Sequence, residues 1–214
     1  MEIEFSNFEV DKKIFGEKTI SGLYDTKGTF IYKNLYGIEK LKVNNNLTVR
    51  TYLLLSKLSR KKYSLTKKLL NDLEIDSTKQ KLKLKELSMV DYIKVLVIRL
   101  VSKSCKTIVL KNIDISLNFN EQARLFNALR RNIKLVNKTI IFESMNIESI
   151  VPNSDYYVIA DDNKVIYSGD DFTKLPVKTE IMEIVDLANK KGAKLSYYKD
   201  INDLLKAIYR SVKQ

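Results

Sequence analysis

The stretch that decides the fold of this chain is residues 87–118, LSMVDYIKVLVIRLVSKSCKTIVLKNIDISLN. Behind Ser88, apolar residues recur at helical spacing and also on further faces, which predicts a mostly buried helix. Thr107–Leu110 is a short apolar run of the kind found in central parallel strands. The polar turn after it begins with Lys111 and Asn112. A metal-dependent enzyme would need carboxylates at this turn, where the sequence has a lysine and an asparagine.

Strands and helices alternate on the C-terminal side of this stretch. The pattern predicts a helix over residues 123–133, a second central strand at Thr139–Phe142 and a short helix around 147–150. A β-hairpin follows, with strands at 156–160 and 164–167. This order predicts an α/β fold with a parallel-sheet core.

The N-terminal part of the sequence shows a different pattern. Apolar and polar residues alternate over residues 2–15, which indicates one or two half-buried antiparallel strands. Further β signals occur at 20–24 and 28–32. We therefore predict an antiparallel β subdomain in this part of the chain.

Two further regions complete the predicted domain organisation. A helical insertion follows the β signals, and its helices are expected to begin at Thr48 and Ser64. The main domain should cover residues 1–170, with its helical subdomain at about 47–88. Strand and helix signals alternate again over 171–214, which predicts a small C-terminal α/β extension.

Composition limits the classes of function that the chain can have. With 214 residues, 44% of them hydrophobic, it can bury a core as one large domain. The absence of histidine excludes histidine-based triads, proton shuttles and metal ligation. The single cysteine, Cys105, excludes an internal disulfide and fits a reducing compartment, where we expect it to be a packed side chain.

Charge and hydropathy indicate the kind of partner and the compartment. The net charge of +12 is typical of chains that bind nucleic acid, anionic lipid or an acidic protein, or of solvated lysine-rich helices. No apolar run reaches the roughly 20 residues that span a bilayer. The acidic, alternating N-terminus MEIEFSNFEV differs from a signal peptide. We therefore expect a soluble, cytosolic protein.

The order of the segments resembles the nucleotide-binding domain of ATP-binding cassette (ABC) transporters, most closely the single-domain kind that serves exporter-type permeases. The resemblance extends over nearly the whole chain and implies a P-loop-NTPase-like, ABC-ATPase-like fold. The segments that carry it are residues 28–34 (the strand after the P-loop helix), 46–51 (the opening of the helical subdomain), Leu87-Ser88 (the start of the signature), Arg99, 107–112 (Walker B), 116–118 (the loop after it), 139–144 (the switch strand), 158–169 (the hairpin) and 171–172.

The departures from the family's pattern fall on its chemistry. A phosphate-binding loop needs glycines so that backbone N–H groups can surround the phosphates, yet the nearest match is GEKT at residues 16–19. Larger side chains replace the signature glycines, a lysine and an asparagine replace the Walker B carboxylates, and a serine replaces the switch histidine. The degenerate positions of the nucleotide site are Lys18, Thr19, Ser88, Met89, Asp91, Lys111, Asn112 and Ser144.

The resemblance implies a catalytically inactive subunit with a structural or regulatory role beside an ABC-type membrane exporter. Its expected partners are a membrane permease subunit, an intact ABC ATPase or both, in a homodimer or heterodimer. Its expected position is the cytoplasmic face of the membrane, with peripheral association and with neither ATP nor Mg²⁺ as a cofactor. By resemblance, Tyr52, Leu53 and Leu54 are the candidates for contact with the permease.

Two alternatives remain open at the level of sequence. The chain could be a divergent ATPase that binds ATP and Mg²⁺ through Lys18-Thr19 and uses Asp114 or Glu143 as its carboxylate. It could also be a basic nucleic-acid-binding module, because residues 60–63 and 79–85 are rich in lysine. No recognition motif accompanies these basic segments, so nucleic acid is the less favoured partner.

Overall fold

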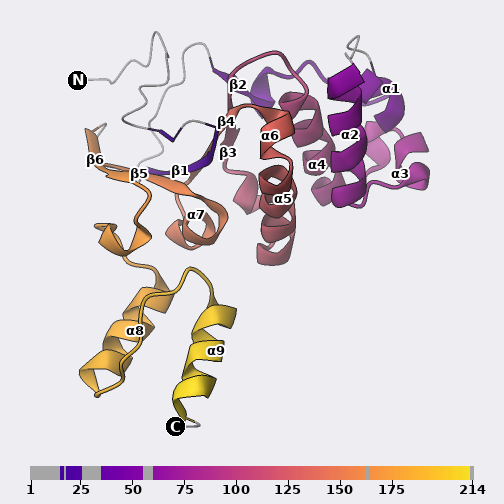
Figure 1. Ribbon diagram of the computed structural model, residues 1–214. Coiled ribbons are helices and arrows are strands. Elements are labelled where there is room, and N and C mark those ends of the chain that lie inside the picture. Colours follow the sequence, from indigo (N-terminus) through magenta and orange to yellow (C-terminus); the bar gives the residue numbers. More distant parts are fainter. Residues whose placement is uncertain (1–14, 17, 26–34, 55–59, 162–163, 213–214) are drawn as a thin grey trace.

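The computed structural model describes residues 15–16, 18–25, 35–54, 60–161 and 164–212 of this chain. Its centre is a six-stranded sheet with the strand order β2-β3-β4-β1-β5-β6 (Figure 1). Neighbouring strands are parallel except β5 and β6, which are antiparallel, so the predicted α/β fold with a parallel core is confirmed. The strands are β1 (Ile20–Asp25), β2 (Tyr36–Gly37), β3 (Thr107–Lys111), β4 (Thr139–Ser144), β5 (Tyr156–Asp161) and β6 (Lys164–Gly169).

Helices connect the strands and extend the molecule at two ends. The first three helices gather beyond the β2 edge of the sheet, and the last two extend away from it (Figure 1). The α-helices are α1 (Val49–Leu54), α2 (Arg60–Asp72), α3 (Ser77–Lys81), α4 (Met89–Val101), α5 (Phe119–Arg131), α6 (Ile133–Val136), α7 (Ile147–Asn153), α8 (Glu180–Lys190) and α9 (Ile201–Val212). Short 3-10 turns are η1 (Ile38–Lys40), η2 (Leu84–Glu86), η3 (Ile113–Ile115) and η4 (Phe172–Lys174).

Both faces of the sheet carry apolar side chains, because successive residues of a strand point to opposite sides. On one face, Ile108 belongs to the main core, where Phe126 of α5 contacts Phe142 of β4 with 4.6 Å between ring centroids. On the other face, Val109 belongs to a second, smaller cluster. The alternation assigns Lys111, the last residue of β3, to this second face.

Three predictions about the elements are wrong. Residues 20–24 were predicted in an antiparallel subdomain, but they belong to β1, a parallel strand between β4 and β5. Because β1 is buried on both faces, its burial does not alternate along the strand, so the sequence pattern does not indicate its neighbours in the sheet. Helix α2 begins at Arg60 rather than at Ser64. In the described part of the C-terminal extension, residues 171–212, only helices occur, so it is not an α/β unit. The predicted strands at 2–15 and 28–32 lie outside the described residues, apart from Phe15.

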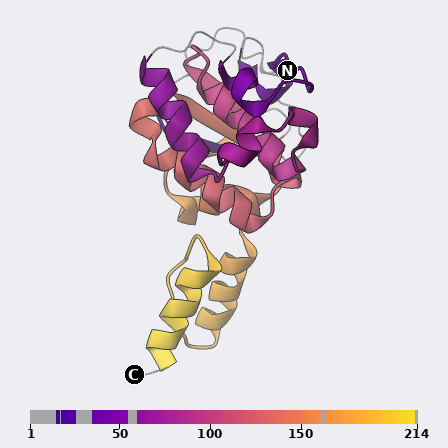
Figure 2. The ribbon, with the colours of Figure 1, turned by 90° about the vertical axis from the view of Figure 1, so that its right-hand side faces the viewer.

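Helices α8 and α9 form a separate unit at the C-terminal end. They run side by side in the same direction, away from the sheet, and the segment 191–200 returns between them (Figures 1 and 2). Their buried apolar side chains, Met182, Val185 and Leu204, belong to neither of the two core clusters. The unit therefore has only a small core of its own.

Glu148 of α7 attaches this unit to the rest of the chain. Its Oε1 atom accepts a hydrogen bond of 2.7 Å from the backbone N–H of Glu180, at the start of α8. Burial raises the pKa of Glu148 above its usual value; the Glu180 N–H opposes this shift, and the charges of Glu180 and Glu183 add to it. The contact therefore holds a carboxyl group whose charged form is disfavoured.

We expect Glu148→Gln to leave the fold intact and to make the free energy of unfolding less dependent on pH. A raised pKa means that this carboxyl contributes stability that is present at low pH and is lost as the pH rises through its folded-state pKa. The amide oxygen of glutamine can still accept the Glu180 N–H without titrating. Urea denaturation between about pH 4 and about pH 7 measures the difference.

Glu148→Ala is the matched control. It removes the acceptor at the start of α8 and should lower the free energy of unfolding by about 1 kcal/mol. Equal stability of the glutamine and alanine variants at neutral pH would contradict a role for this hydrogen bond.

Candidate functional site

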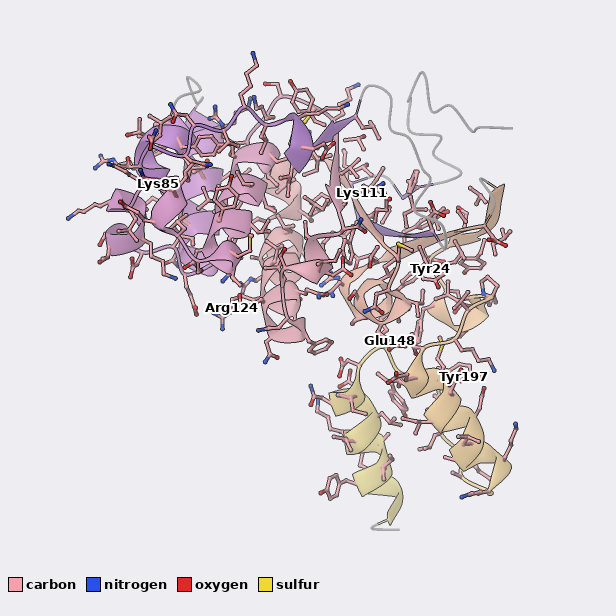
Figure 3. The ribbon with its side chains drawn as sticks, turned by 180° about the vertical axis from the view of Figure 1, so that it is seen from behind. Tyr24, Lys85, Lys111, Arg124, Glu148 and Tyr197 are labelled. Carbon is pink, nitrogen blue, oxygen red and sulfur yellow. The ribbon has the colours of Figure 1, made fainter. Side chains whose placement is uncertain are left out.

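The carboxyl ends of β1, β3 and β4 lie at one edge of the sheet, where ligands of α/β proteins bind. Lys111 ends β3 and lies directly opposite Glu143 of β4. Ser144 ends β4, and the buried Asp25 ends β1. Figure 3 labels Lys111 in this region, with Tyr24 of β1 nearby in the view. The structure thus brings three of the sequence-predicted positions, Lys111, Asn112 and Ser144, to one edge.

An ion pair between Lys111 and Glu143 dominates this edge. The Nζ atom of Lys111 is 2.8 Å from Oε1 of Glu143, whose side chain is only 2% exposed, whereas that of Lys111 is 36% exposed. A buried carboxylate is costly without a charge of opposite sign, and Lys111 supplies that charge. An ammonium group has only donors, so Lys111 itself cannot coordinate a metal ion.

Hydrogen bonds attach the turn after β3 to the end of β4. The N–H of Asn112 donates to the carbonyl oxygen of Glu143 at 2.9 Å. The hydroxyl of Ser144 donates to Oδ2 of Asp114 at 2.6 Å and accepts from the N–H of Asn146 at 2.9 Å. Asn112 has a left-handed φ of 51°, which asparagine tolerates better than most residues. These contacts fix the turn after β3 against the end of β4.

Glu143 and Asp114, the two carboxylates of the alternative ATPase hypothesis, both contact other side chains of this site. Glu143 is paired with Lys111, and one oxygen of Asp114 accepts from Ser144. The other oxygen of Asp114, Oδ1, is buried and has no hydrogen-bond partner among the described residues. In the part of the chain that the structure describes, no three His, Cys, Asp or Glu side chains are grouped so that they could hold a metal ion.

Lys18 and Thr19 do not belong to this site. Thr19 precedes β1, and the N–H of Lys18 donates to Oγ1 of Thr139, the first residue of β4, at 3.2 Å. The strand rise of about 3.3 Å per residue puts Thr139 about 17 Å from Ser144 at the other edge. A phosphate loop follows the carboxyl end of its strand, so the assignment of GEKT to that loop is wrong. Residues 26–34, which follow β1, lie outside the described residues.

Ser88, Met89 and Asp91 lie at the beginning of α4. The N–H of Asp91 donates to Oγ of Ser88 at 3.1 Å, and this cap confirms the predicted start of the helix. Asp91 also pairs with Lys79 of α3 at 2.9 Å, while Met89 is 62% exposed. Accessible helix-start N–H groups bind phosphate. At the start of α4, the side chain of Ser88 accepts one of these N–H groups instead. Asp91 contacts Lys79 of α3, so the helix start is joined to the helices α1–α3 and not to Lys111.

Two of the three candidates for contact with a permease are core residues, so that prediction is wrong for them. Tyr52 and Leu53 are 1% and 3% exposed. The guanidinium of Arg99 lies 5.3 Å from the centre of the Tyr52 ring and donates to the carbonyl oxygen of Leu53 at 3.1 Å. Burial raises the pKa of Tyr52, although the charge of Arg99 opposes the shift.

Leu54 is the candidate that remains at the surface. It is 45% exposed, and so is the neighbouring Tyr63 at 54%. Both line a cavity of about 690 Å³ between the first three helices, together with polar and charged side chains such as Arg50 and Glu74. The difference from Tyr52 and Leu53 arises because α1 directs one side toward the core and Leu54 away from it.

Comparison with known proteins supports the fold. One similar solved structure is an inward-facing conformation of a metal-chelate type ABC transporter, with a TM-score of 0.53 and 14% identity over 72% of this chain and 72% of that chain. No family model matches the chain, and no curated protein does. The α/β fold is therefore similar to that of an ABC transporter protein. None of the helices in the described ranges has the length and apolarity that crossing a membrane requires.

Proposed function

We propose that this chain is a catalytically inactive, ABC-ATPase-like subunit that acts as a structural or regulatory partner of an ABC-type membrane exporter. The ion pair of Lys111 and Glu143 is the observation that supports inactivity most directly. It places a fixed positive charge at the sheet edge where the enzyme class would hold Mg²⁺. Mg²⁺ binds oxygen ligands in octahedral geometry, and a neighbouring ammonium both repels it and occupies the carboxylate.

The proposed role as a partner rests on the fold and on the exposed surface of helices α1, α2 and α3. The fold is similar to that of an ABC transporter protein, and in such an assembly the chain would lie peripherally at the cytoplasmic face of the membrane. Its partner would be a permease subunit, an intact ABC ATPase or both. The exposed Leu54 and Tyr63, which line the cavity between the first three helices, are the described apolar residues that best fit this contact.

Assays with MgATP on the purified chain test the proposal. We expect no turnover above the buffer background and no rise in the thermal midpoint, because a protein that binds no nucleotide gains no stability from it. An intact ABC ATPase in the same assay is the positive control. Mg²⁺-dependent hydrolysis that is lost in an Asp114→Asn variant would refute inactivity and favour the divergent ATPase.

The proposed partner is tested by co-purification. A tagged chain recovered from detergent-solubilised membranes should retain a permease or an ABC ATPase, and Leu54→Glu should reduce that recovery, because a charge would be buried at the contact. A residue of comparable exposure in β6, Ile166→Glu, serves as the control for this surface. Recovery of nucleic acid alone would contradict the proposed partners.

A further inference from the structure

The unit of α8 and α9 exposes more apolar surface than a pair of short helices can easily tolerate. Ile184 and Leu187 of α8 are 46% and 58% exposed, and Ile201, Leu205 and Tyr209 of α9 are 41%, 45% and 70% exposed. Helices of 11 and 12 residues are marginal by themselves in water, and this unit has only a small core of its own. Covering these side chains would therefore stabilise it.

One side of α8 carries a short stripe that begins with an acid and ends with a base. The stripe consists of Glu180, Ile184 and Leu187 of α8 and of Lys191, the residue directly after it, and all four residues are exposed. Their spacing of four, three and four residues places them on one side of a helix with 3.6 residues per turn. This is the spacing by which helices pack against each other in bundles.

The rest of the unit leaves that side open. The returning segment 191–200 contacts α8 through Asp186, whose Oδ1 atom accepts a hydrogen bond of 2.6 Å from the hydroxyl of Tyr197. Two residues correspond to about 200° around a helix, so Asp186 faces nearly opposite to Ile184. In Figure 3, Tyr197 is labelled on this unit, below the sheet. The stripe thus lies on the uncovered side of α8.

We propose that two copies of this chain associate through α8 in antiparallel orientation, related by a two-fold axis at the middle of the stripe. Reversal of the stripe places Ile184 of each copy against Leu187 of the other. It also places Glu180 of each copy against Lys191 of the other. Each of these contacts therefore occurs twice, as an interface with two-fold symmetry requires.

Charge identifies a second copy as the occupant. An acid at one end and a base at the other make the stripe complementary to its own reverse, whereas its net charge of zero gives it no attraction to an anionic membrane surface. The association is independent of the proposed function, because the stripe lies outside the edge formed by β1, β3 and β4.

Sedimentation of the full chain over a range of concentrations tests the association. The unmodified chain should form dimers, and Leu187→Glu should raise the dissociation constant at least about tenfold, because it places like charges at the centre of the contact. Leu187 is exposed, so the monomer should keep its circular dichroism spectrum. Ile166→Glu changes a residue of comparable exposure, 54%, in β6 and should leave the dimer unchanged.

Charge reversal distinguishes this geometry from other modes of association. Glu180→Lys and Lys191→Glu should each weaken the dimer, whereas the double variant should restore it, because each pair is then reversed but complementary. A mixture of the two single variants should form heterodimers in preference to either homodimer. A monomer at all concentrations, or a dimer that tolerates both Leu187→Glu and the charge reversals, would overturn the proposal, as would capture of a different protein or of lipid vesicles through the same stripe.

Discussion

Replacement of Lys111 with methionine should lower the free energy of unfolding by about 2 kcal/mol. The change leaves the carboxylate of Glu143, which is 2% exposed, without the ammonium group 2.8 Å away. Removal of one partner of a buried pair typically costs about 3–5 kcal/mol, and the partial exposure of Lys111 reduces that cost. Methionine keeps the length and the apolar stem of lysine, so the lost charge is the main difference. Urea denaturation at neutral pH measures the effect.

Two controls separate the ion pair from packing. The double variant Lys111→Met, Glu143→Gln should recover most of the loss, because no uncompensated charge then remains. Lys68→Met, on an exposed position of α2, should change stability by no more than about 0.5 kcal/mol. A double variant as unstable as Lys111→Met alone would show that the pair is not what makes Lys111 important.

Gly22→Ala should be the most damaging small substitution in the sheet, with a loss of about 3 kcal/mol. A Cβ atom at Gly22 of β1 would lie 2.4 Å from both Cγ2 of Ile150 and Oγ of Ser154. Both atoms belong to the segment that packs α7 against this central strand, so the strand or the helix would have to shift. Thermal and urea denaturation of the purified variant measure the loss.

Gly192→Ala is the matched control for the loss of a glycine. Its φ of +96° strains any side chain, but nothing lies within 4 Å of an added Cβ atom. We expect a loss of about 1 kcal/mol from backbone strain alone. Combining Gly22→Ala with Ile150→Ala should cost less than the sum of the two single changes, because the second vacates space that the first fills. Strict additivity would argue against the steric explanation.

Much of the sheet and of its connections could be predicted from the sequence. The strands at Thr107 and Thr139 and the helix start at Ser88 follow from local signals that the tertiary structure does not override. The pairing of Lys111 with Glu143 also had a signal, because each residue follows the first threonine of its strand by the same number of positions, and those threonines lie opposite each other. From the sequence, Glu143 is predicted only as an alternative catalytic carboxylate, and its pairing with Lys111 is not predicted.

The errors have physical reasons. A short motif such as GEKT does not indicate at which end of a strand it lies, so Lys18 and Thr19 were assigned to the wrong edge. The resemblance located α1 in the helical part of the chain but did not indicate which of its sides faces inward. Tyr52 and Leu53 are therefore buried although they were predicted to bind a partner. The arrangement of α8 and α9 depends on contacts between distant residues, such as that of Glu148 with Glu180.

The Lys111–Glu143 pair also determines what the sheet edge can exchange with its surroundings. A metal ion is a separate particle, and its occupancy rises and falls with its concentration and with the nucleotide that accompanies it. The ammonium of Lys111 is tethered to the neighbouring strand, so its effective concentration beside Glu143 is high and constant. In the proposed inactive subunit, the conformation of this edge would therefore not respond to the concentration of nucleotide. It would also provide no binding energy for a conformational change in a neighbouring subunit. Such a subunit would supply the exporter with a constant shape.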